Sequence, residues 1–339
     1  MSILVTGAAG FIGSHVCRHL VERGDEVIGV DNLNDYYDPA LKQARLARLQ
    51  AHENFSFVVG DIAEPGVLAA ACGGRVIDKV VHLAAQAGVR YSLENPRAYI
   101  RANVSGHFEM LEFCRSAGTI EHLVYASSSS VYGGNEKVPF SEDDNVDRPV
   151  SLYAATKRAD ELMSHAYAHL YGIAQTGLRY FTVYGPWGRP DMAYWMFTEA
   201  ILAGRPIRVF NQGNLWRDFT YIDDVVTGTV MVLDRPPGGA EAAHRIYNIG
   251  HNNPEHLGRF IDLLEDLIGV PAIRQYEPMQ PGDVEQTFAD ITRLHDDFGF
   301  APAVSLSDGL KSFVAWYRSF AADRPGTGSQ SESQSGSGR

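Results

Sequence analysis

The chain has 339 residues, of which 45% are hydrophobic, and a formal net charge of −12. This length suffices for one large or two modest domains, and the excess of acidic residues argues against a nucleic-acid-binding surface. Its apolar runs are shorter than a membrane span, so no membrane partner is expected. The three cysteines, Cys17, Cys72 and Cys114, match no disulfide framework or metal site, which favours a reducing cytoplasm and predicts no bound metal.

The first half of the chain alternates short apolar strands with helical segments. Strands are expected at residues 3–5, 26–30, 55–59, 79–84, 122–126 and 174–179, and helices notably at 11–23, 96–116 and 151–171. Strands separated by helices are typical of a parallel sheet with helices on both faces. The predicted fold class is α/β, a doubly wound Rossmann sheet with a smaller mixed α/β C-terminal domain.

The regular alternation stops after Tyr180. A turn-rich loop at residues 185–190 is followed by helices and short strands without a regular period. We predict a first domain at residues 1–180 and a smaller substrate domain at 181–322, allowing for a crossing of the chain back to the first domain. Residues 323–339 are mostly Gly, Ser, Gln and Pro with scattered charges, a composition typical of a disordered tail.

A glycine-rich segment, Thr6-Gly7-Ala8-Ala9-Gly10-Phe11-Ile12-Gly13, joins the first expected strand to the first helix. Glycines at this spacing allow a tight turn and let the backbone approach a pyrophosphate at the helix N-terminus. Asp31 ends the second strand, where a carboxylate binds adenosine ribose hydroxyls and repels a 2′-phosphate, so NAD is favoured over NADP. Asp61 ends the third strand, where either an adenine contact or a helix N-cap would explain it.

Tyr153 and Lys157 lie four residues apart on one face of the helix expected at 151–171. A free phenol ionises near pH ~10, and a cation beside it favours the phenolate, which is a usable base. Because such pairs are common on helix surfaces, this one gains its weight from the glycine loop in the same half of the chain.

The glycine loop, Asp31, Leu83-Ala84-Ala85 and Tyr153-x-x-x-Lys157 together resemble the extended short-chain dehydrogenases/reductases, over residues 1 to about 320. Within that superfamily the chain resembles the nucleotide-sugar epimerases. Three stretches are similar to those of UDP-glucuronate 4-epimerases: GVRYSLENP at residues 88–96, TVYGPWGRPDMA at 182–193 and RDFTYI at 217–222.

The resemblance implies interconversion of UDP-glucuronate and UDP-galacturonate by oxidation and re-reduction at carbon 4. Tyr153 would take the proton of the 4-hydroxyl, aided by Lys157, and Ser128 would donate to the oxygen on carbon 4. A tightly bound NAD, regenerated in each cycle, is implied at a set of residues on strand ends and the Tyr/Lys helix: Gly7, Gly10, Phe11, Ile12, Gly13, Asp31, Asn32, Asp61, Ile62, Leu83, Ala84, Ala85, Tyr153, Lys157 and Tyr180. A homodimer through the helices at 96–116 and 151–171 is also implied.

The UDP-sugar is expected to contact residues from both halves of the chain: Arg90, Ser128, Ser129, Ser130, Tyr153, Thr182, Arg189, Arg217 and Asp283. Thr182, Arg189 and Ser130 are hypothesised to hold the sugar carboxylate, with Arg90 a second candidate. The alternatives for Arg189 are a loop-surface arginine or an inter-loop salt bridge. The resemblance places Arg217 on the diphosphate, although an ion pair with a nearby aspartate would also explain it. Asp283 is a candidate for the uridine ribose or for a network with Arg217. For Asn103, backbone bracing and ligand contact are equally consistent with the sequence.

The serine run discriminates between reactions. Related 4,6-dehydratases carry an Asp-Glu pair where this chain has Ser129 and Ser130, so dehydration is disfavoured. Related decarboxylases carry a glutamate at Ser130, which weakens that alternative and leaves it open. A 4-epimerase of UDP-glucose or UDP-N-acetylhexosamine is the other close alternative. From a different class, a non-catalytic dinucleotide-binding protein would usually lack the Tyr/Lys pair.

Overall fold

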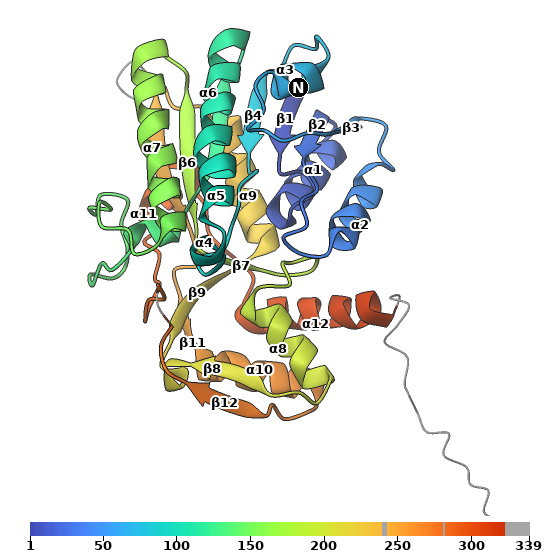
Figure 1. The fold of residues 1–339 in the computed structure, drawn as a ribbon, viewed down its shortest axis with the longest axis vertical. Helices are drawn as coiled ribbons and strands as arrows, with labels where there is room; N and C mark the ends of the chain where they lie inside the picture. The colour runs from blue at the N-terminus through green and yellow to red at the C-terminus, as the bar shows by residue number, and fades with distance from the viewer. Residues whose placement is uncertain (239–242, 281, 323–339) are drawn as a thin grey trace, which may run out of the picture.

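Seven parallel strands form the main sheet of the computed structural model, in the order β10-β6-β5-β4-β1-β2-β3 (Figure 1). The structure describes residues 1–238, 243–280 and 282–322, so the tail predicted at 323–339 lies outside the described residues. The strands of this sheet are β1 (Ser2–Thr6), β2 (Glu26–Asp31), β3 (Phe55–Val59), β4 (Lys79–His82), β5 (His122–Ser128), β6 (Gln175–Tyr180) and β10 (His244–Ile249). This confirms the predicted doubly wound α/β fold.

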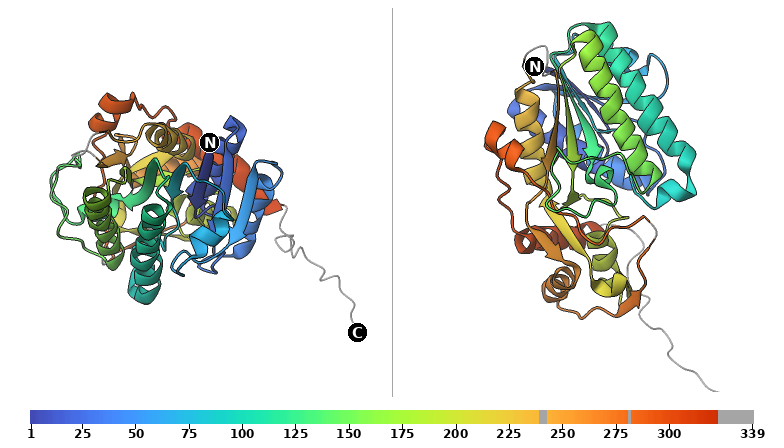
Figure 2. Two further views of the ribbon diagram at one scale, coloured as in Figure 1. Left: turned by 90° about the horizontal axis from the view of Figure 1, so that it is seen from above. Right: turned by 90° about the vertical axis from the view of Figure 1, so that its left-hand side faces the viewer.

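Helices cover both faces of this sheet, as its buried strands require. The right-hand view of Figure 2 shows α6 (Gly106–Ala117) and α7 (Leu152–Tyr171) on one face, and α1 (Phe11–Arg23) and α9 (Ile222–Asp234) on the other. The remaining helical segments around the sheet are α2 (Pro39–Leu49), α3 (Val67–Cys72), α4 (Tyr91–Glu94), α5 (Pro96–Tyr99), η1 (Ile100–Ser105), η2 (Ser129–Tyr132) and α11 (Thr292–Phe298).

Helix α1 has the bounds that the sequence predicts. It ends where Gly24 adopts the left-handed conformation, with φ of 96°, and its N–H caps the last turn. The helix expected at 96–116 is interrupted by the π-helical segment η1, which separates α5 from α6. Such segments insert an extra residue into the helix and are frequent at functional sites.

The chain leaves the main sheet after β6 and builds a smaller layer beyond its C-terminal edge (Figure 1). This layer contains a three-stranded sheet, a two-stranded sheet, three α-helices and a 3-10 turn: β7 (Thr182–Tyr184), β8 (Ile207–Phe210), β9 (Trp216–Tyr221), β11 (Pro254–His256), β12 (Arg274–Glu277), α8 (Ala193–Leu202), η3 (Asn211–Gly213), α10 (Leu257–Ile268) and α12 (Leu306–Ala322). The elements α9 and β10 return to the main sheet. The division at residue 180 stays a prediction, with this crossing part of it.

The register of the central strands aligns their C-terminal ends. Thr6 of β1 pairs with Val30 of β2 on one side and with His82 of β4 on the other. The loops that follow these strands therefore lie side by side on the edge that faces the smaller layer.

Candidate active site

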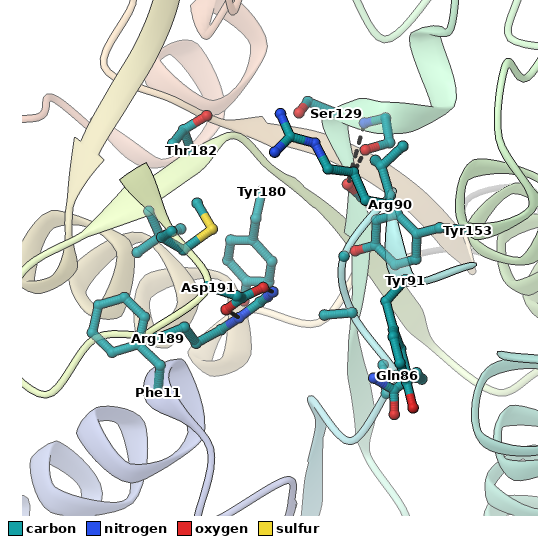
Figure 3. A pocket seen from close by; sticks show the side chains of 18 of the residues that line it. Phe11, Gln86, Arg90, Tyr91, Ser129, Tyr153, Tyr180, Thr182, Arg189 and Asp191 are labelled. Carbon is teal, nitrogen blue, oxygen red and sulfur yellow. Dashed lines mark hydrogen bonds and ion pairs between the residues drawn. The ribbon is translucent and has the colours of Figure 1, made fainter. Parts of the chain in front are cut away.

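A cavity of about 780 Å³ lies between the main sheet and the smaller layer. Every residue that the sequence analysis assigned to cofactor, substrate or catalysis lines it, including Tyr153, Lys157 and Ser128. Figure 3 shows side chains from several elements around this space, among them Phe11, Arg90, Ser129, Tyr153, Thr182 and Arg189. The topology thus brings the predicted site residues together, while their individual roles stay predictions.

The glycine loop forms a cradle too tight for larger side chains. A Cβ on Gly13 would lie 2.0 Å from the carbonyl oxygen of Gly7, and one on Gly7, at φ of +71°, would lie 2.7 Å from the Ala84 nitrogen. The backbone at the start of α1 is therefore bare on the side of the cavity, which is what a dinucleotide pyrophosphate needs. The residues present fit NAD.

Asp31 is fixed at the end of β2 by the glycine loop. Its carboxylate accepts the N–H of Ala9 at 3.2 Å and that of Leu33 at 2.9 Å, and Lys42 Nζ lies 3.8 Å away. Each carboxylate oxygen has a further lone pair, so this position also suits acceptance from ribose hydroxyls. The carboxylate therefore has a structural role in the loop, and its role in ribose binding stays a prediction.

Asp61, Asn32 and Tyr180 line the cavity with side chains that already have partners. Asp61 accepts the N–H of Ala63 at 3.0 Å and also pairs with Arg101, also at 3.0 Å. Asn32 accepts the N–H of Asn34, and the Tyr180 hydroxyl shares a hydrogen bond with Thr229. Contacts of all three residues with the cofactor stay predictions.

The Tyr153/Lys157 pair of helix α7 lies next to the C-terminal part of strand β5. Lys157 is buried, and its ammonium donates to the carbonyl oxygen of Ala126 at 2.9 Å and to Asp160 Oδ2 at 3.0 Å. The Tyr153 ring packs edge-on against Tyr99, with centroids 6.0 Å apart. Helix α7 begins at Ser151, whose side chain accepts the N–H of Ala154 and caps the first turn.

Asn103, in the π-helical segment η1, braces the backbone. Its carbonyl accepts the N–H of Gln86 at 2.8 Å, and its amide donates to the Gln86 carbonyl and to Thr156 Oγ1. The side chain thereby ties the loop after β4 to α7. Of the two roles considered for Asn103, the structure supports bracing.

The serine run divides into a structural and a cavity-facing part. Ser127 donates to Glu161 Oε1 at 2.6 Å, and Glu161 is in a buried two-point pair with Arg179. Ser128 to Ser130 line the cavity, and Ser128 Oγ accepts the N–H of Ser130 at 3.2 Å. The strand β5 is therefore anchored one residue before the serine predicted to act on the substrate.

Arg189 meets Asp191 in the cavity wall. Its Nε lies 3.0 Å from Asp191 Oδ1 and its Nη2 lies 2.5 Å from Oδ2, while Tyr36 donates to the same carboxylate at 3.0 Å. Burial opposes ionisation of Asp191, but the guanidinium outweighs it and holds the pKa of Asp191 below its usual value. The salt bridge of Arg189 is therefore made within its own loop, not between loops, and Arg189 still lines the cavity (Figure 3).

A second charged group lies where the two layers meet. Asp283 pairs with Arg90 at 3.1 Å and lies 3.8 Å from Arg217, and the Arg90 guanidinium stacks over Phe210 at 4.7 Å from its ring centre. Arg217 also donates to the carbonyls of Trp216 and Glu285. Asp283 therefore takes part in the predicted Arg217 network, and Arg90 bridges the layers.

Four residues of this site were not singled out from the sequence: Tyr36, Asp160, Asp191 and Phe210. Asp160 could have been found, because it follows Lys157 by three residues on a helix, the spacing of neighbouring side chains. Asp191 lies within a stretch that resembles the epimerases, without a role assigned to it. Tyr36 lies on a loop, where sequence periodicity carries no signal, and Phe210 ends the short strand β8, for which the sequence analysis gave no bounds.

Residues 1–238, 243–280 and 282–322 hold no cluster of metal-ligating side chains, and none of their helices is both long and apolar enough to cross a membrane. Cys17, Cys72 and Cys114 are buried free thiols.

Comparisons with known proteins agree with this geometry. Residues 3–250 match the model of the NAD dependent epimerase/dehydratase family. UDP-glucuronate 4-epimerase 1 of Arabidopsis thaliana is 50% identical over 332 residues, which cover 94% of this chain and 77% of that protein. Among solved structures, the UDP-glucuronic acid 4-epimerase from Bacillus cereus in complex with UDP-glucuronic acid and NAD is similar with a TM-score of 0.88 and 35% identity, covering 94% of this chain and all of that one.

The UDP-glucose 4-epimerase of Thermotoga maritima with UDP-glucose is also similar, with a TM-score of 0.85 and 32% identity over 95% of this chain and all of that one. The family model covers well over half of the chain, and the similarity of the relatives runs through both layers. The chain therefore belongs to the NAD dependent epimerase/dehydratase family.

Proposed function

We propose that this protein interconverts UDP-glucuronate and UDP-galacturonate by oxidation and re-reduction at carbon 4, without loss of carbon dioxide. The observation that carries the proposal is the composition of one cavity wall. Ser128–Ser130, Thr182 and Arg189 line the same space as Tyr153 and Lys157, and positions 129 and 130 hold hydroxyls rather than carboxylates. When bound, NAD supplies the reversible two-electron oxidation of carbon 4.

Tyr153 takes the proton of the 4-hydroxyl and returns it when the ketone is reduced. Lys157 favours the phenolate, since an adjacent cation stabilises the charged form of an acid. Ser128 donates to the oxygen on carbon 4, where negative charge develops. The two-sided cavity leaves room for the ketone to turn over between the two transfers.

Oxidation at carbon 4 of a glucuronate creates a β-keto acid, which loses carbon dioxide when the carboxylate bond aligns with the carbonyl π system. An epimerase must hold the carboxylate out of that alignment by contacts from fixed positions. Thr182, Ser130 and Arg189 are proposed for this task. The ion pair with Asp191 fixes the Arg189 guanidinium, which keeps further N–H donors for the substrate.

Arg217 is proposed to bind the diphosphate, because a planar guanidinium suits bidentate phosphate contacts. Asp283 beside it would hold either Arg217 itself or the uridine ribose.

We also propose a homodimer built from α6 and α7. Both helices carry large apolar side chains that are exposed in the single chain, namely Phe108, Leu162, Leu170 and Tyr171. Pairing them with a second copy would bury this surface. The three buried free thiols support placement in the cytoplasm.

Proton NMR of the products formed from UDP-glucuronate, with purified protein and no added NAD, tests the proposed function. We expect UDP-galacturonate, and no turnover in Tyr153→Phe. UDP-xylose as the main product would favour the decarboxylase. Turnover of UDP-glucose or UDP-N-acetylglucosamine with none of UDP-glucuronate would favour a 4-epimerase of neutral sugars, and no turnover of any of them would favour a non-catalytic binding protein.

A further inference from the structure

A buried carboxylate lies behind Lys157. Asp160 is 1% exposed, and its Oδ2 accepts from the Lys157 ammonium at 3.0 Å. Its Oδ1 is buried and has no hydrogen-bond donor among the residues that the structure describes. An isosteric asparagine would fill the same space without a charge, and buried ion pairs are weak sources of stability. Packing alone therefore does not explain an aspartate here.

The hydrogen bonds of Lys157 show how Asp160 acts on it. An ammonium has three N–H donors, and the structure describes partners for two of them, Ala126 O and Asp160 Oδ2. Both partners are protein groups, and Lys157 also lines the cavity. Asp160 thus restricts the rotation of the ammonium and places a negative charge directly beside it.

The other titratable groups around Asp160 keep one charge state between pH 5 and 8. Burial lowers the pKa of His82 to about 3 and of His244 to about 4, and it lowers that of His107 and raises that of Tyr125. Glu161 stays ionised because the pairing with Arg179 outweighs burial and lowers its pKa. Burial raises the pKa of Asp160 to about 6, a rise that Lys157 limits. Among these groups, Asp160 alone changes charge in this range.

We propose that Asp160 is a positioning residue for the reaction, which orients the Lys157 ammonium and attenuates its charge, and thereby sets the pH range in which Tyr153 works as a base. This inference rests on the proposed role of Tyr153 as the base. It adds a third member to the Tyr153/Lys157 pair, one that acts through Lys157 without touching the substrate.

The pH dependence of kcat/KM tests the proposal. Asp160→Asn removes the negative charge, so the full charge of Lys157 reaches Tyr153, and we expect the acidic limb of the profile to move to lower pH by about one unit. Asp296→Asn makes the same chemical change at an exposed position on α11 and should leave the limb in place. A folded Asp160→Asn protein with the wild-type profile would overturn the proposal.

Two further measurements test the effect of Asp160 without any turnover of substrate. Their failure can therefore be told apart from a failure of the proposed function. The first is the near-ultraviolet titration of phenolate, taken as the difference between a protein and its Tyr153→Phe variant. In the Asp160→Asn background this difference signal should appear at lower pH than in the wild type. Coincident titrations would contradict an effect of Asp160 on Tyr153, whether or not UDP-glucuronate is the substrate.

The second is a thermal-denaturation cycle at pH 8. Lys157→Met leaves Asp160 buried without its cation, which is strongly destabilising, and adding Asp160→Asn should restore part of the lost Tm. Adding Asp296→Asn to Lys157→Met should restore none. A double variant Lys157→Met/Asp160→Asn that melts no higher than Lys157→Met would show that the two side chains are not coupled, and the proposal would fall.

Discussion

The Arg189 guanidinium and the Asp191 carboxylate form a two-point ion pair in the wall of the cavity, with distances of 3.0 Å from Nε to Oδ1 and 2.5 Å from Nη2 to Oδ2. Tyr36, from the loop after β2, donates to the same carboxylate. The hydrogen bond from Tyr36 to Asp191 therefore links the loop after β2 to the loop after β7. The ion pair holds a cation in a fixed direction before any substrate arrives, which lowers the entropic cost of binding an anion.

Arg189→Ala should impair handling of the sugar carboxylate more than handling of a neutral sugar. Loss of a charge-assisted hydrogen bond costs about 1.5–3 kcal/mol, so we expect KM for UDP-glucuronate to rise at least about tenfold and the share of UDP-xylose among the products to increase. Steady-state kinetics and product NMR measure both. Arg205→Ala, at an exposed arginine paired with Glu199, serves as the control. An unchanged KM and product ratio would remove Arg189 from the carboxylate site.

Gly13→Ala should empty the cofactor site. The added Cβ would lie 2.0 Å from the carbonyl oxygen of Gly7, so the glycine loop must shift, at a cost of about 1–3 kcal/mol. We expect a lower Tm and loss of most of the NAD that is released when the purified protein is denatured. Gly134→Ala is the matched control, because its Cβ would meet only Val150, at 3.8 Å. NAD retention equal in both variants would argue against a pyrophosphate on this loop.

Elements and strand ends were predictable from local patterns. The bounds of α1 follow from an apolar run between a glycine loop and Gly24, and the strand end at Asp31 follows from its buried, β-rich neighbours. The strand expected at 122–126 runs two residues further, to Ser128. Because parallel strands end on one edge, the sequence also predicted that these residues meet. The resemblance to the epimerases added the residues of the smaller layer, such as Thr182 and Arg217.

Partner choices between distant loops were not predictable in the same way. Tyr36 donates to Asp191 from the loop after β2, and Arg90 stacks on Phe210 of β8, because segments far apart in the sequence fold over each other in three dimensions. The π-helical turn at Ile100–Ser105 was missed since its residues suit an ordinary helix, and the bracing of Gln86 by Asn103 stabilises it. The spacing of residues along the sequence predicts neither these contacts nor the π-helical turn.

Leu162→Glu should convert the proposed dimer to a monomer. Leu162, on α7, is 54% exposed in the single chain, and a carboxylate at that place would face its symmetry mate in the interface without a partner. Sedimentation velocity at micromolar protein should show the mass of one chain instead of two. Ile273→Glu is the control, because Ile273 is exposed to a similar degree, at 57%, and lies in the smaller layer between α10 and β12. A wild-type protein that sediments as a monomer would contradict the homodimer, and dimers in both variants would place the interface elsewhere.

Asp160 should make stability fall as pH rises. Burial raises its folded-state pKa to about 6, above the value of about 4 in an unfolded chain. The group therefore contributes stability that is fully present below about pH 4 and is lost as the pH passes through 6, since the folded protein binds the proton more tightly. Asp160→Asn does not titrate in this window. We expect its free energy of unfolding, relative to wild type, to increase by a few kcal/mol between pH 4 and 7, as measured by urea denaturation.

Subtracting the two proteins cancels the other titrating groups, which both share. The difference therefore reports the cost of ionising Asp160 in its buried place. Asp296→Asn should give a flat difference, because an exposed carboxylate pays little to ionise in the folded chain. A flat difference for Asp160→Asn as well would mean that the Asp160 carboxylate titrates as it does in water. It would contradict a buried ion pair between Asp160 and Lys157.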